Sequence, residues 1–255
     1  MNRTVVASLF LVSLSLVGGR GIKLPAASPV GFPNAPVQYE GVLATLSIRA
    51  SELSYFSASQ GEEVWSYTYE EQSGVPFVRF PNGDRWLILS SSDLLLAYNS
   101  ESSRPFFIGA DEPRAIQAFR FEPSVFDSTS FLIEGDTRYT PDNLGIPSTR
   151  APWVEGVEGV GVGQRITIAR SVRTLFVSIG FVSFDRPELY ELNARPQTLR
   201  VDFPDGTTRA VTLEDTPNPQ RIDLGERVSG ISLRIESVYE GERWTDTVIN
   251  FIGLM

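Results

Sequence analysis

The stretch Pro152–Ile168, PWVEGVEGVGVGQRITI, decides how the rest of the chain is interpreted. A dinucleotide-binding loop has the order G-x-G-x-x-G between a strand and a helix. Here the order is G-x-x-G-x-G-x-G, and the β-branched run that follows predicts a strand. No Lys-Ser or Lys-Thr pair closes the loop, and Glu155 and Glu158 would repel a phosphate. We therefore predict a loop that enters a strand, with glycines where close backbone approach leaves no room for a Cβ.

The composition excludes several classes of site. The 255 residues include no His and no Cys, which rules out the Ser–His–Asp triad, thiolate nucleophiles, disulfides and zinc sites built on those residues. Catalysis would depend on Asp, Glu, Tyr, Lys or Arg. The net charge of −9 and the pI of about 4.7 argue against binding to nucleic acid or to an anionic membrane.

The N-terminus resembles an export signal. Arg3 precedes the apolar run Thr4–Gly19, which is shorter than the roughly 20 residues of a membrane-spanning helix. We predict a signal peptide at residues 1–19, with an uncleaved anchor as the alternative. The mature protein would then be periplasmic, cell-surface or secreted, without a membrane-spanning segment. Residues 20–36 are rich in Pro, Ala and Gly and are predicted to be a linker.

Residues 37–115 contain short runs of β-branched and aromatic residues bounded by turn residues. The sequence PNGD at Pro81–Asp84 predicts a hairpin between two of them. We predict a small antiparallel β domain that ends between residues 110 and 120, where the sequence becomes charged. Its expected strands are 41–48, 76–80, 85–90, 93–99 and 105–109.

The C-terminal half has longer strand patterns and no helical period. In TLRVDF, residues 199, 201 and 203 are apolar while 200 and 202 are charged, as in a half-buried strand. The sequence PDGT at Pro204–Thr207 predicts a second hairpin. The pattern predicts an all-β fold, a jelly-roll β-sandwich after the small antiparallel β domain. Its expected strands are 164–169, 174–182, 198–203, 208–213, 220–224, 230–239 and 247–254.

The glycine-rich stretch resembles the signature W-x-E-G-x-x-G-x-G-x-G-E/Q-x-I-x-I of the NADase-type glycan-binding domain family, a discoidin-like, galactose-binding-like β-sandwich. The resemblance covers about residues 121–255. Ile179 and Phe251 depart from it, because the family usually has Asn at the first position and often an acid at the second. Four further segments resemble the family's motifs in order: SIGFVS (Ser178–Ser183), LNARPQTLRVDFPDGT (Leu192–Thr207), LEDTPNPQRIDL (Leu213–Leu224) and IESVYEGERWTDTVINFI (Ile235–Ile252).

The resemblance implies attachment to a glycan or glycoconjugate rather than catalysis. The family takes its name from the module that accompanies the catalytic domain of some bacterial NAD glycohydrolases, and nothing in this sequence resembles that catalytic domain. We expect an exported, carbohydrate-binding module of the bacterial cell envelope that is not an enzyme. We expect no catalytic residue, no cofactor and no metal, with a structural calcium ion as the alternative.

Sugar-binding sites combine an aromatic ring that stacks on the sugar with planar polar groups that bind its hydroxyls. Each candidate also has a structural interpretation: a core position for the Trp residues, a turn for Asn193 and Arg195, and loop stabilisation by Glu155 or Asp246. The candidate ligand-binding residues are Trp153, Glu155, Asn193, Arg195, Trp244 and Asp246.

Two other functions remain open. One is an envelope module that binds a protein partner, since the fold does not choose between sugar and protein. The other is a glycoside hydrolase with two carboxylates about 5 to 9 Å apart.

Overall fold

The computed structural model describes residues 35–39, 42–48, 51–57, 61–110 and 119–255. The predicted signal peptide therefore lies outside the described residues. So do residues 20–34 of the predicted linker and residues 111–118, where the domain boundary was expected. The last two residues of that linker, Ala35 and Pro36, begin a strand instead and pair with Leu46 and Thr45. Among the described residues, no helix is long and apolar enough to span a membrane.

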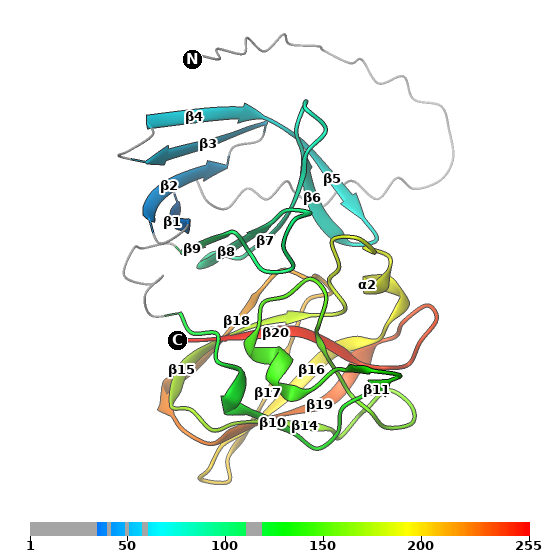
Figure 1. Cartoon of the computed structure of the whole chain (residues 1–255). Helices are drawn as coiled ribbons and strands as arrows, with labels where there is room; N and C mark the ends of the chain where they lie inside the picture. Colours follow the sequence, from blue (N-terminus) through cyan, green and yellow to red (C-terminus); the bar gives the residue numbers. More distant parts are fainter. Residues whose placement is uncertain (1–34, 40–41, 49–50, 58–60, 111–118) are drawn as a thin grey trace, which may run out of the picture.

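The N-terminal unit is a single antiparallel sheet that curls on itself (Figure 1). Its strand order is β4-β3-β2-β1-β9-β8-β7-β6-β5. All five strands expected here are present, with bounds that shift by one or two residues. The strands are β1 (Ala35–Tyr39), β2 (Val42–Ile48), β3 (Glu52–Ser57), β4 (Gly61–Ser66), β5 (Thr68–Gln72), β6 (Val75–Arg79), β7 (Arg85–Ser90), β8 (Leu94–Tyr98) and β9 (Phe107–Ala110).

Both predicted hairpins are confirmed. At PNGD, the Phe80 N–H donates to the Asp84 carbonyl at 2.8 Å, and Gly83 has a φ of 92°. At PDGT, the Phe203 N–H donates to the Thr207 carbonyl at 2.9 Å, and the glycine of the turn again has a positive φ. These turns need a residue that tolerates the left-handed region, which glycine does.

The C-terminal unit is the expected β-sandwich, with sheets of order β10-β14-β19-β16-β17 and β13-β20-β15-β18 and a small pair, β11-β12. Every strand expected here is present. The strands are β10 (Phe126–Ser128), β11 (Ile133–Glu134), β12 (Thr137–Arg138), β13 (Trp153–Val154), β14 (Arg165–Ile168), β15 (Val172–Ile179), β16 (Arg195–Asp202), β17 (Thr208–Thr212), β18 (Gln220–Val228), β19 (Ile231–Tyr239) and β20 (Val248–Leu254).

The alternation in β16 has the predicted consequence. Leu199 and Val201 are fully buried between the two sheets. Arg200 forms an ion pair with Glu236, and Asp202 forms one with Arg234, both on the neighbouring strand β19. The period of two therefore separates the core face from the charged face.

The expectation of no helix needs a correction. One helical turn, α2 (Leu189–Leu192), precedes β16, and two 3-10 turns, η1 (Pro123–Val125) and η2 (Pro141–Gly145), lie before β13. Both 3-10 turns have a proline in their first two positions, where its missing N–H is not needed. A single turn is too short to produce the helical periodicity that a sequence pattern reveals.

The two units lie against each other (Figure 1) and share a hydrophobic layer. In β15, Leu175 and Val177 face the sandwich core, whereas Phe176 between them faces the N-terminal sheet. Phe251 of β20 also faces that sheet, and its ring lies 5.8 Å from that of Phe121. The sheet β13-β20-β15-β18 is therefore covered on both faces. Residues from the N-terminal unit in this layer are Val75, Phe77, Leu87, Leu89, Leu94, Leu96 and Tyr98.

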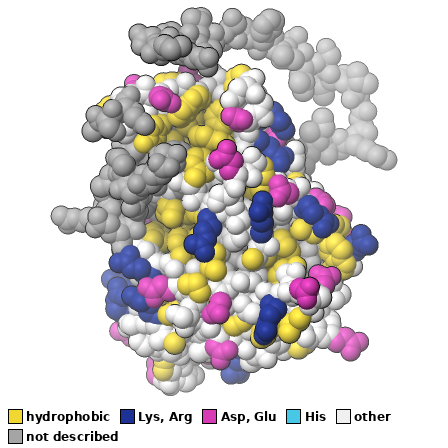
Figure 2. Space-filling view, viewed as in Figure 1, with side chains coloured by type: hydrophobic (Ala, Val, Ile, Leu, Met, Phe, Trp, Pro, Cys, Tyr) yellow, Lys and Arg dark blue, Asp and Glu magenta, His cyan; other side chains and the backbone are white. Residues whose placement is uncertain are grey.

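Polar contacts also join the units. Arg85 donates to the Phe184 carbonyl at 2.9 Å, and its guanidinium lies 4.1 Å from the centre of the Phe77 ring. The Ser90 N–H donates to Asn218 Oδ1 at 3.0 Å. On the face shown in Figure 2, charged side chains of both signs are spread over the sandwich, while hydrophobic side chains gather on the N-terminal unit.

Candidate functional site

Three segments meet where β20 begins. The Glu155 N–H donates to the Thr247 carbonyl at 3.1 Å, and the Val248 N–H donates to the Ala194 carbonyl at 3.0 Å. The glycine-rich loop, the segment after α2 and the β19–β20 loop therefore lie at one end of the sandwich. Figure 1 shows this end, with α2 and β11, away from the C-terminus. We call it the rim.

Trp153 lies inside the sandwich, not on the rim surface. Its side chain is completely buried in the core, and Nε1 donates to Ser128 Oγ and to the Ser130 carbonyl, both at 3.2 Å. Stacking on a sugar requires an exposed ring face, which Trp153 does not have. Of the two interpretations from the sequence, the core position is the one that its burial fits.

Glu155 organises the glycine-rich loop. Its Oε2 accepts from the Val157 N–H at 2.8 Å, and its Oε1 accepts from the Thr247 N–H at 3.4 Å. Burial raises the pKa of this carboxyl, while the two backbone hydrogen bonds oppose that shift. A Cβ at Gly161 would lie 2.6 Å from Glu155 Cγ, and one at Gly156 would lie 2.3 Å from the Phe131 carbonyl oxygen. The predicted close backbone approach is present at both glycines.

Asn193 and Arg195 are buried and have partners within the protein. Asn193 Nδ2 donates to the Leu189 carbonyl at 2.8 Å and so binds the start of α2. Arg195 forms a two-point contact with Asp215, at 2.5 and 2.7 Å, and its guanidinium lies 4.8 Å from the centre of the Tyr190 ring. Both side chains therefore join α2 to β16, as the structural interpretation of the sequence requires.

Trp244 and Asp246 are half-buried and remain accessible at the rim. The Trp244 N–H donates to the Leu192 carbonyl at 2.8 Å, which attaches the loop to α2. The Arg243 guanidinium lies 4.9 Å from the centre of the Trp244 ring. Burial, and secondarily the charge of Glu134, raise the pKa of Asp246.

The structure adds an aromatic pair that the sequence did not single out. The half-buried rings of Tyr139 and Phe181 meet edge to face, with centroids 6.1 Å apart. Burial raises the pKa of the Tyr139 hydroxyl, and the charge of Glu134, on the hairpin before Tyr139, raises it further. Phe181 lies where the resembling family has Tyr, a signal that could have identified it. Tyr139 carried no such signal.

We call Glu134, Tyr139, Phe181, Trp244 and Asp246 together the rim site. It combines partly exposed aromatic rings with carboxylate acceptors. Two exposed arginines, Arg138 and Arg243, directly precede Tyr139 and Trp244 in the sequence and offer guanidinium donors. This set of groups matches what sugar recognition uses. Within the described ranges, no group of three or more His, Cys, Asp or Glu side chains is placed to hold a metal ion.

Comparison with known proteins gives one family. A solved structure described as "Glycoside hydrolase" is similar over 88% of this chain and 72% of its own, at 8% sequence identity and a TM-score of 0.32, which is too low to support an argument. No curated protein matches the chain. The family model described as "NAD glycohydrolase translocation F5/8 type C domain" matches residues 121–254, more than half of the chain and the same part that carries the sequence resemblance. With a discoidin-like β-sandwich in that region and all five family motifs in order, the chain belongs to the NAD glycohydrolase translocation F5/8 type C domain family.

Proposed function

We propose that this chain is an exported, non-catalytic module that binds a glycan or glycoconjugate through the rim site. The observation that carries the proposal is the pair of half-buried rings Tyr139 and Phe181 close to the charge of Glu134, which also acts on Asp246 at the loop end of the sandwich. A third half-buried ring, Trp244, lies two residues before Asp246 in the same loop. Membership of an F5/8 type C family is consistent with a binding module of carbohydrate-binding type.

The physical argument concerns what each group offers a sugar. A pyranose has an apolar face of C–H groups, which stacks on an aromatic ring. Its hydroxyls donate to carboxylates such as Asp246 and accept from guanidinium groups, and charged partners strengthen such hydrogen bonds. Because Arg243 already lies over the Trp244 ring, one ring face has a cation and the other is the candidate stacking surface.

The surroundings of two of the three acids at the rim, Glu155 and Glu134, favour binding over hydrolysis. A glycoside hydrolase needs one carboxyl as acid and a second as base or nucleophile across the scissile bond. Glu155, the most deeply buried acid at the rim, already accepts from two backbone N–H groups. Glu134 is exposed on the β11–β12 hairpin, where water weakens its influence on a reacting bond.

A glycan array with the whole chain tests the proposal. The C-terminal unit alone is unsuitable, because its removal from the N-terminal sheet would expose the buried rings of Phe176 and Phe251. The variants are Trp244→Ala and Phe181→Ala. The matched control is Phe56→Ala, which removes an aromatic ring that is 52% exposed on β3 of the N-terminal unit. We expect saturable binding that weakens about tenfold or more in each rim variant, since one stacked ring contributes about 1 kcal/mol beyond its buried area, and no change in the control.

Other outcomes contradict the proposal. If the folded wild type binds no glycan but retains one protein from an envelope extract, insensitively to free sugars, the rim is a protein-binding surface. If the chain cleaves a chromogenic glycoside and Asp246→Asn abolishes the cleavage, the chain is a hydrolase. Circular dichroism of every variant separates loss of binding from loss of folding.

A further inference from the structure

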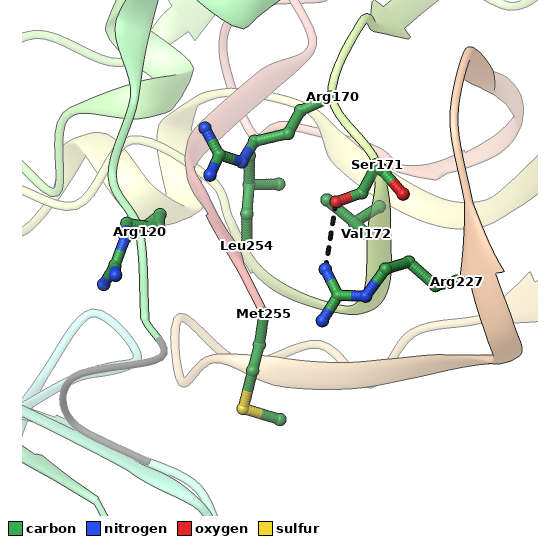
Figure 3. Close-up of a pocket in the computed structure, with 7 residues that line it drawn as sticks. All are labelled: Arg120, Arg170, Ser171, Val172, Arg227, Leu254 and Met255. Carbon is green, nitrogen blue, oxygen red and sulfur yellow. Dashed lines mark hydrogen bonds between the residues drawn. The ribbon is translucent and has the colours of Figure 1, made fainter. Parts of the chain in front are cut away.

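A second candidate site lies at the opposite end of β20 from the rim. Here Arg120 and Leu254 form an isolated β-bridge beside the turn that joins β14 to β15. The cavity at this place has a volume of about 230 Å³. Figure 3 shows its lining residues: Arg120, Arg170, Ser171, Val172, Arg227, Leu254 and Met255.

Three arginines line this cavity although the chain has a net charge of −9. They come from separate segments: Arg120 precedes η1, Arg170 follows β14, and Arg227 lies near the end of β18. A negatively charged ligand in the cavity would be attracted by the guanidinium groups of Arg170 and Arg227.

The contacts of Arg170 and Arg227 leave donors for such a ligand. Arg170 forms an ion pair with Glu122 through Nη1, and its side chain is 44% exposed. Arg227 Nη1 donates to the Ser171 carbonyl at 3.3 Å, as the dashed line in Figure 3 marks. A guanidinium carries five N–H donors in a planar fork, and a carbonyl acceptor orients the group without neutralising its charge.

We propose that this cavity binds one oxyanion group, a carboxylate, sulfate or phosphate, between Arg170 and Arg227. Guanidinium groups match the planar geometry of such ions and bind them by pairs of charged hydrogen bonds. The volume is below the 300 to 1,000 Å³ typical of pockets for larger ligands, so the site accommodates a single charged group. That group is either a free ion or the acidic substituent of a sugar.

Calorimetric titration of the whole chain tests the proposal. The probes are inorganic phosphate, inorganic sulfate, glucuronate and glucose 6-phosphate, with glucose as the neutral control and ionic strength held constant with NaCl. We expect saturable binding of at least one anion, no binding of glucose at this cavity, and weakening at high salt because the site is open to screening. Much tighter binding of a sugar acid than of the free ions would identify a sugar substituent as the ligand, and equal binding would identify the free ion.

Variants with effects of opposite sign make the test specific. Arg227→Gln and Arg170→Gln should each weaken anion binding about tenfold, since a charged hydrogen bond contributes about 1.5 kcal/mol or more. Glu122→Gln should tighten binding a few fold, because it removes a carboxylate that competes for Arg170. Arg165→Gln removes an exposed arginine of β14 that does not line the cavity and should change nothing.

Absence of saturable anion binding overturns the proposal, as does equal weakening in Arg165→Gln and Arg227→Gln. The result is independent of the rim. Trp244→Ala should leave anion binding unchanged, and Arg227→Gln should leave binding of an uncharged glycan at the rim unchanged. Failure at one site is therefore distinguishable from failure at the other.

Discussion

At the scale of single residues, burial separates side chains that the sequence could not rank. Trp153 and Trp244 both stand in family-like motifs, yet the first is completely buried and the second is half-exposed. The cause is strand register. Trp153 pairs with Ile249 of β20, and both side chains lie on the face of that sheet that is turned to the sandwich core. Trp153 is therefore part of the core, while Trp244 stays partly exposed.

The glycine-rich loop predicts a large effect from adding one methyl group. A Cβ at Gly156 would lie 2.3 Å from the Phe131 carbonyl oxygen, which is backbone and cannot move aside freely. We expect Gly156→Ala to lower the free energy of unfolding by about 1 to 3 kcal/mol, measured by urea denaturation. Val157→Ala, at an exposed neighbour, should change it by less than about 0.5 kcal/mol. Equal effects would mean that close packing is not why glycine is needed.

Asp246 predicts a pH-dependent change in stability. Its pKa is raised from the ordinary 3.8 by burial and by Glu134, so the folded protein holds this proton more tightly than the unfolded chain. The contribution of Asp246 to stability is therefore most favourable below pH 3.8 and becomes unfavourable as the pH rises through the raised pKa. We expect Asp246→Asn to be more stable than the wild type near pH 7, with the difference shrinking towards acidic pH. A difference between the two proteins that does not vary with pH would contradict this.

At the scale of elements, one ion pair attaches α2 to the sandwich. Asp215, before β18, accepts from Arg195 and from the Tyr190 hydroxyl of α2. We expect Asp215→Asn to lower the free energy of unfolding by about 1 to 3 kcal/mol, because it leaves a guanidinium with a side chain only 9% exposed without its counter-charge.

The control for this prediction is Asp185→Asn, whose pair with Arg150 has both side chains 60% exposed. An exposed pair contributes about 0 to 1 kcal/mol. If urea denaturation gives the same loss for both variants, the buried attachment of α2 is not what Asp215 provides.

Element length also explains which strands were predicted. The long strands of the sandwich repeat their apolar positions often enough to be recognised, as β16 does. Strands β10 to β13 have only two or three residues each, too few for a period. In the N-terminal unit, β5 has the sequence TYEEQ with no fully buried residue, so it shows neither an apolar run nor a clear alternation.

At the scale of the whole molecule, the two units each have a core of their own and pack together through a common hydrophobic interface. This arrangement gives a reason for one departure from the family pattern. Phe251 stands where the family often has an acid, and here its side chain is completely buried against the N-terminal sheet. A carboxylate at this place would be desolvated without a partner, so a phenylalanine suits a sandwich that carries this extra layer.

The shared layer predicts coupled unfolding. We expect Phe251→Ala to lower the free energy of unfolding by about 3 to 5 kcal/mol. The transitions followed by far-ultraviolet circular dichroism and by tryptophan fluorescence should shift together as one step, because tryptophans of both units, Trp65 and Trp86 in one and Trp153 in the other, report on the same transition. Phe56→Ala, at an exposed ring, is the control. Two separate transitions in the wild type would show that the units unfold independently.

The sequence by itself determined the all-β class, the long strands of the sandwich, five strands of the N-terminal sheet, both hairpins and the family of residues 121–254, because these depend on local periodicity, turn chemistry and motif spacing. It did not identify β1, β3, β4 and β5. It also located the loops that form the rim. Only the tertiary structure decided which side chains of those loops face solvent, because exposure depends on strand register and on contacts between segments far apart in the chain. For that reason Trp153, Glu155, Asn193 and Arg195 are buried with partners inside the protein, while Tyr139 and Phe181 stay partly exposed. The arginine-lined cavity and the layer shared by the two units arise in the same way, from residues that the fold alone brings together.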